Sequence, residues 1–191
     1  DQYAEVYNRS SDTPLDVGGW GLEGSNGQSS LIPYGTMIPP SSHLMFSGPP
    51  NAPQGFGLSA LGAATRQLPY GDSGTLTIPQ ADGGVRLAGP TGASVDAVGF
   101  GTVGPVYRSG TALTDPGFGG QSAFARRFSA GQPVNTANNA ADFLTLDTTG
   151  SPHSILGAPR PDGLTAPTVH NDILQSGLID PGVAASASPN Q

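Results

Sequence analysis

The chain lacks two residue types that most proteins of its size contain. Its 191 residues include no cysteine and no lysine, and only 11% of them are charged. The absence of cysteine excludes a disulfide framework, a thiolate metal site and a thiol nucleophile. No apolar run approaches the roughly 20 residues that a membrane-spanning helix needs, so we expect no transmembrane segment.

Positive charge is scarce and dispersed. All seven cationic side chains are arginines, fourteen carboxylates oppose them, and the net charge is −7. Only Arg126 and Arg127 are adjacent, whereas nucleic-acid binding requires clustered Lys and Arg that neutralise phosphates. We therefore expect no nucleic-acid partner.

Glycine and proline are abundant by contrast, with 29 and 19 residues. They interrupt nearly every window that a long helix would need. Between them, short runs alternate apolar and polar residues at the period of a β-strand, and turn signals such as Asn26-Gly27 separate the runs. The sequence thus predicts an all-β antiparallel sandwich or barrel, with strands at 3–7, 20–23, 30–32, 43–46, 75–78, 84–88, 94–100, 122–128 and 143–146.

The chain divides into a β-domain over 1–150 and an extended Pro-rich tail over 151–191. Within the domain, glycine and proline concentrate in 48–74 and 99–120, which we predict to be long loops. Two apolar stretches, 58–68 and 169–178, predict a turn or two of helix each.

The apolar side chains of the predicted strands form the expected core. Trp20 is the single tryptophan, and after Gly18-Gly19 we expect its ring to be buried between the sheets rather than stacked on a sugar. The predicted core residues are Val6, Trp20, Leu22, Ile32, Leu44, Phe46, Val85, Leu87, Val95 and Phe143.

Four separated motifs occur in a recognisable order. They are Tyr3–Asn8 (YAEVYN), the run 14–40 that contains PLDVGGWGL and IPYGTMIPP, the paired segments 84–87 and 94–99, and Asn135–Phe143 (NTANNAADF). Over about residues 1–150, this order resembles the bacterial lamin-tail-like domain. Segments 48–74 and 151–191 lie outside the family pattern, and the strand that usually precedes the first motif has no counterpart in this sequence.

The resemblance implies an immunoglobulin-like β-sandwich. It also implies a secreted or surface module that binds or anchors rather than catalyses. Because the chain begins at Asp1 rather than Met, we expect that a signal peptide has been removed or the chain trimmed. The expected location is extracellular or periplasmic.

Several motifs are of types that occur in binding or catalytic sites, but each has a simpler structural explanation. Residues 99–104 match G-x-G-x-x-G, but Pro105 follows where a dinucleotide site would need a helix. The three histidines (43, 153 and 170) have no metal-ligand spacing, and the sequon at Asn8 recurs by chance. Asp16 and Asp142 are best explained as turn-capping groups that accept backbone N–H bonds. We expect no catalytic residue, no cofactor and no bound metal.

Isolated aromatic and aliphatic residues in the loops and tail are the expected partner contacts. Such segments are too polar to pack alone, but they can wrap around a partner. The candidates are Phe56, Tyr70, Tyr107, Phe118, Ile173 and Leu174.

The sequence therefore favours a non-catalytic exported subunit that docks through loops and tail onto a larger protein assembly. A cell-surface layer and the outer face of a membrane complex are both candidates for that assembly. The alternatives are an accessory domain of a secreted hydrolase, and a calcium- or glycan-binding module.

Overall fold

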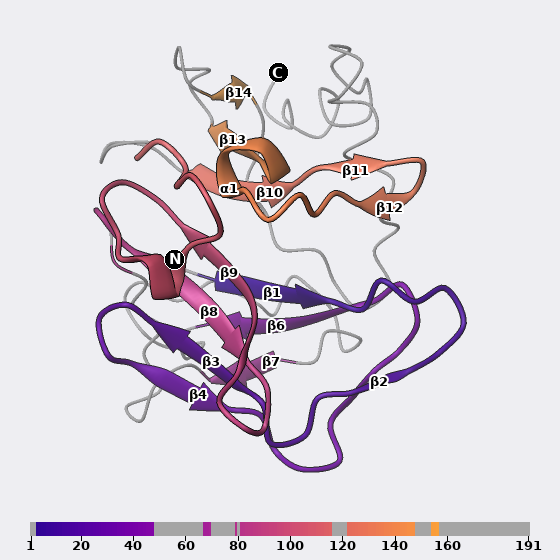
Figure 1. Ribbon diagram of the computed structural model, residues 1–191. Coiled ribbons are helices and arrows are strands. Elements are labelled where there is room, and N and C mark those ends of the chain that lie inside the picture. Colours follow the sequence, from indigo (N-terminus) through magenta and orange to yellow (C-terminus); the bar gives the residue numbers. More distant parts are fainter. Residues whose placement is uncertain are drawn as a thin grey trace, which may run out of the picture.

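The protein is built almost entirely of β-strands. The computed structural model describes residues 3–47, 67–69, 79, 81–115, 122–147 and 154–156 (Figure 1). Within these residues the only helical elements are one turn of α-helix, α1 (Asn139–Asp142), and one 3-10 turn, η2 (Pro105–Tyr107). The prediction of an all-β fold is confirmed.

The strands pair into several sheets, most of them antiparallel. Their bounds are β1 (Tyr3–Tyr7), β2 (Leu15–Asp16), β3 (Gly21–Gly24), β4 (Ser29–Leu31), β5 (Met37–Ile38), β6 (His43–Ser47), β7 (Gln67–Pro69), β8 (Gly84–Ala88), β9 (Ser94–Gly99), β10 (Ser122–Arg126), β11 (Phe128–Ser129), β12 (Gln132–Pro133), β13 (Phe143–Asp147) and β14 (Ile155–Leu156).

The largest sheet has the order β4-β3-β8-β9. The turn predicted at Asn26-Gly27 joins β3 to β4, and a second turn at 89–92 joins β8 to β9. Gly24 N donates to Gln28 O at 2.7 Å and Gly89 N donates to Ala93 O at 2.8 Å. Gly27 and Gly92 take φ values of +82° and +80°, a region that glycine enters without steric cost.

A second sheet, β1-β6-β7, shares a core with the first. Leu22 and Leu87 come from the large sheet, Leu44 and Phe46 come from β6, and all four are buried in one cluster. Of the other predicted core residues, Ile32 is buried in this cluster, and Val6, Trp20 and Val85 are partly buried against it. The two sheets are therefore two layers around one apolar interior.

Val95 was predicted to be in the core, and the structure corrects this. Its side chain is 51% exposed. Asp96 pairs across the strands with Leu87, and the register shifts beside that pair. Cross-strand partners share a face, so Asp96 and Val98 occupy the inner face and Val95 points outward.

Two strand pairings are parallel, which the sequence did not predict. β7 runs parallel to β6, and β14 runs parallel to β13. Gln67 and Leu68 therefore lie in a strand rather than in the helical turn predicted for 58–68, the rest of which lies outside the described residues. The predicted elements at 75–78 and 169–178 lie outside them too.

The last part of the domain forms further small sheets above β1 and β6 (Figure 1). The predicted strand 122–128 is split at Arg127, whose N–H donates to Asp142 O at 2.8 Å, so β10 pairs with β13 and β11 pairs with β12. A second cluster of buried Phe100, Leu113 and Phe143 joins this region to β9. The Tyr7 and Phe128 rings also meet edge to face, 5.5 Å apart.

Candidate functional site

The side chain of Asn139 makes three hydrogen bonds to the backbone of other segments. Its Oδ1 accepts hydrogen bonds from Gly99 N at 2.9 Å and Ser109 N at 3.0 Å, and its Nδ2 donates to Ala97 O at 2.8 Å. Asn139 is 1% exposed. One amide thus joins α1 to the outer edge of β9 and to the loop that follows it.

Asp142, one turn further along α1, closes the preceding loop. Its carboxylate accepts hydrogen bonds from Thr136 N, Thr136 Oγ1 and Asn138 N. Burial raises the pKa of Asp142, but these hydrogen bonds and the charge of Arg126 outweigh it, and the pKa lies below its ordinary value of 3.8. Asp142 therefore remains ionised at neutral pH, as a turn-capping carboxylate.

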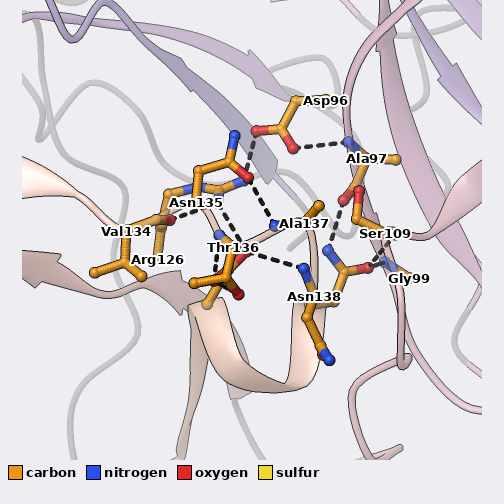
Figure 2. A network of polar contacts seen from close by, with 12 residues as sticks. Asp96, Ala97, Gly99, Ser109, Arg126, Val134, Asn135, Thr136, Ala137 and Asn138 are labelled. Carbon is orange, nitrogen blue, oxygen red and sulfur yellow. Dashed lines mark hydrogen bonds and ion pairs between the residues drawn. The ribbon is translucent and has the colours of Figure 1, made fainter.

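Arg126 of β10 is the cation of this network (Figure 2). Its Nη2 lies 2.5 Å from Asp96 Oδ2 on β9, and its Nη1 donates to Val134 O at 2.9 Å. The guanidinium also stacks over the Phe143 ring, 4.2 Å from its centroid. The side chains of Asp96, Arg126, Asn139 and Asp142 all bond to other groups of the protein, so the network acts as a brace between β9 and the C-terminal strands. We call Asp96, Arg126, Asn139 and Asp142 the polar brace.

The first glycine of the G-x-G-x-x-G segment allows close packing of the backbone. A Cβ at Gly99 would lie 2.5 Å from Tyr107 O, and one at Gly84 would lie 2.6 Å from the same oxygen. The two glycines face each other across β8 and β9, and together they let η2 lie directly on the sheet. Within the described loop no α-helix opens at 101–104, as expected.

A shallow depression of about 300 Å³ lies beside this loop, lined by Gly101, Thr102, Val103, Arg108, Thr111 and Ala112. The Arg108 guanidinium is engaged at its rim. It donates to Val103 O at 3.2 Å and to Gly110 O. The cation therefore stabilises the loop's own backbone.

Asn8, the residue of the sequon, is a structural group. It is 3% exposed, and its Nδ2 donates to Thr13 O at 2.9 Å, Ile38 O at 3.0 Å and Pro39 O at 3.1 Å. An amide buried in this way is not presented for modification. Asp16 is likewise a capping group, because its Oδ1 accepts from Gly18 N at 2.9 Å.

The described residues contain no group of three or more His, Asp or Glu side chains placed to hold a metal ion. A search of the same residues also finds no helix long and apolar enough to cross a membrane.

Three of the five large apolar side chains that are exposed in the described residues lie on one short segment, whose exposure we did not predict, and the other two are Val95 and Val106. Leu31 is 68% exposed, Tyr34 is 86% exposed and Met37 is 44% exposed. We call residues 31–37 the apolar segment. At a rise of about 3.4 Å per residue its length is at most about 20 Å, so all three side chains fit beneath one partner.

The inward residues of the apolar segment hold it in place. Ile32 and Thr36 are both fully buried. Ile32 N donates to Trp20 O at 2.7 Å, and Thr36 O accepts from Val17 N at 3.0 Å. The outward side chains of the apolar segment are therefore displayed from a fixed backbone.

The tip of the Tyr34 ring lies close to the backbone of Gly19. A Cβ at Gly19 would lie 2.9 Å from Tyr34 Cε1, and Gly19 takes a φ of +79°. The ring thus rests against bare backbone on one side and faces solvent on the other.

A sequence signal for this surface exists. From Gly24 to Thr65 the chain carries no Asp, Glu, Lys or Arg, and the apolar segment lies within this uncharged run. Combined with exposed strand positions, that run marks the apolar segment.

Of the predicted partner contacts, Tyr107 alone lies among the described residues. It is partly buried, and the Arg86 guanidinium lies 6.0 Å from its ring centroid. Phe56, Tyr70, Phe118, Ile173 and Leu174 lie outside the described residues.

Comparison of the chain with models of protein families, with curated proteins and with solved structures finds no match.

Proposed function

We propose that this protein is a non-catalytic, exported binding subunit that docks onto a larger protein assembly. The observation that carries the proposal is the exposure of Leu31, Tyr34 and Met37 on an uncharged segment whose backbone is hydrogen-bonded to the rest of the fold. Exposed apolar side chains gathered in one place are typical of protein-interaction surfaces, and aromatic anchors on fixed backbone are typical of their energetic centres.

The order of the sequence motifs supports the same proposal. It resembles the bacterial lamin-tail-like domain, which implies an immunoglobulin-like sandwich that is secreted or displayed on the surface. We propose this fold family and location for the chain. Segments 48–74, 99–120 and 151–191 are proposed as further contacts with the assembly, through the aromatic and aliphatic residues they carry.

The test is retention of a partner by the full-length chain. The wild type, a Leu31→Asp/Tyr34→Ala variant and a Val95→Asp control are immobilised and exposed to the exported and membrane fractions of the source organism. Val95 is the matched control because it is also an exposed apolar side chain. We expect the wild type and the control to retain the same proteins at least tenfold better than the double variant, and equal retention by all three would refute the proposal.

Two inexpensive measurements separate this proposal from the alternatives. A divalent metal at one equivalent in the purified chain would favour the accessory domain of a hydrolase. A rise in the thermal midpoint with calcium or sugars would favour a calcium- or glycan-binding module.

A further inference from the structure

We propose that two copies of this chain associate edge to edge through β4, so that the four-stranded sheet of one continues into that of the other. This inference rests on the proposed function, because it names a second copy as the partner of the apolar segment.

The backbone of β4 has one side open. Gly24 N donates to Gln28 O and Ile32 N donates to Trp20 O, while Leu22 pairs with Ser30 midway between them. In an antiparallel ladder the inward groups recur at every second residue. Residues 28, 30 and 32 therefore face β3, and Ser29 and Leu31 direct their N–H and C=O groups away from the sheet.

Nothing in the described part of the chain covers these groups. Ser29 is exposed, and the Leu31 side chain is 68% exposed. An unprotected edge is a template for a further strand. β4 is the edge strand of the four-stranded sheet (Figure 1).

The charge distribution favours a second copy as the occupant. Two chains of net charge −7 repel each other, and they can meet most easily where each is neutral. The run from Gly24 to Thr65 has no charged residue. The nearest charge across the ladder is Glu23, opposite Ser29, and Arg86 Nη2 neutralises it at 2.6 Å.

The edge is also complementary to itself. With a two-fold axis at Ser30, Ser29 of one copy pairs with Leu31 of the other, and both pairs exchange backbone hydrogen bonds. Each Leu31 then lies on the same face, diagonally opposite its counterpart. Pro33 has no N–H, so pairing ends there and the register is fixed.

The experiment is sedimentation equilibrium of the full-length chain from about 5 to 200 µM, a range suited to a small edge-to-edge interface. We expect a reversible equilibrium between species of 19.2 kDa and twice that mass. Leu31→Asp places like charges diagonally across the two strands and is expected to weaken association at least tenfold. Val95→Asp, at the other edge of the same sheet, makes the same charge change and is expected to leave association unaltered.

Ser29→Pro provides a second, independent test. It removes an outward N–H while leaving the ladder to β3 intact, so it is also expected to weaken association at least tenfold. Far-UV circular dichroism identifies the variants that fold, and only those are compared. A wild type that stays monomeric to 200 µM overturns the inference, as does equal weakening by Val95→Asp.

The two proposals fail separately. A monomeric wild type whose partner retention is still lost in Leu31→Asp/Tyr34→Ala refutes the dimer and supports the proposed function. A dimer abolished by Leu31→Asp supports this inference, even where the double variant retains other proteins as the wild type does.

Discussion

The two edges of the four-stranded sheet are closed to very different degrees. On β9, the outward groups of Ala97 and Gly99 are all engaged: Asn139 bonds to Ala97 O and Gly99 N, Leu113 N donates to Gly99 O, and Asp96 Oδ1 accepts from Ala97 N. On β4, the outward N–H and C=O groups of Ser29 and Leu31 have no such hydrogen-bonding partners in the described residues.

The difference shows that, among the described residues, the β9 edge of the sheet is protected and the β4 edge is not. A strand edge can be blunted by side-chain hydrogen bonds, charge or a covering loop, and β9 has all three. β4 has only its short length and the neighbouring Pro33. We infer that the polar brace serves stability, whereas the open edge and the apolar segment serve association.

The largest expected effect is at the closed edge. Asn139→Ala removes three buried hydrogen bonds and leaves Ala97 O, Gly99 N and Ser109 N without that partner. We expect a loss of about 3–5 kcal/mol in the free energy of unfolding, measured by urea denaturation. Asn135→Ala is the control, because its exposed side chain makes a single local bond to Ala137 N, and an equal loss there would contradict the assigned role of Asn139.

The second prediction compares two glycines of the same sheet. A Cβ at Gly84 would lie 2.6 Å from Tyr107 O and 2.8 Å from Val98 O, whereas at Gly21 the nearest atom is 3.9 Å away. Gly84→Ala is expected to cost about 2–3 kcal/mol because backbone atoms must move. Gly21→Ala should stabilise the strand by about 0.5 kcal/mol; thermal midpoints that fall alike in both variants would show that η2 does not constrain Gly84.

The third prediction concerns pH. Because the pKa of Asp142 is lowered in the folded state, its ionised form stabilises the fold above its ordinary value of 3.8, and this stability is lost as the pH falls through the folded-state pKa. Asp142→Asn should lower the free energy of unfolding by about 1.5 kcal/mol at pH 7. It should also make the free energy of unfolding depend less on pH at acid pH. Urea midpoints from pH 2 to 7 measure both, and an unchanged dependence on pH would contradict the role of Asp142.

The smallest effect is expected at the open edge. Leu31→Ser changes a side chain that is 68% exposed, so the free energy of unfolding should shift by less than about 0.5 kcal/mol at low concentration. A loss above about 1 kcal/mol in chemical denaturation would mean that Leu31 packs within its own chain.

Much of the strand pattern followed from the sequence, since alternation and glycine turns are local signals. The strands at 3–7, 43–47 and 84–88 match their predicted positions to within one residue. β7 and β14 were missed because Gln67–Pro69 and Ile155–Leu156 are too short to show a period. They are strands only because β6 and β13 offer them hydrogen-bonding partners.

The candidate surface was harder to predict than the strands. Aromatic residues in the loops were predicted to be partner contacts because their surroundings in the sequence are polar. Tyr107, however, is partly buried beside Arg86. Tyr34 belongs to a motif that implied structure, and its ring lies beside Gly19 of a different turn. A contact between two different turns leaves no local pattern in the sequence.

The sequence by itself determined the chemistry available to this protein. Without cysteine it has no thiol chemistry, and its alternating runs between glycines favour strands. Only the tertiary structure decided which strand edge is covered, that Val95 faces outward, and that Asn8 and Asn139 are buried as hydrogen-bonding centres. The physical reason is that alternation specifies two faces of a strand, whereas burial depends on what the rest of the chain packs against each face and edge.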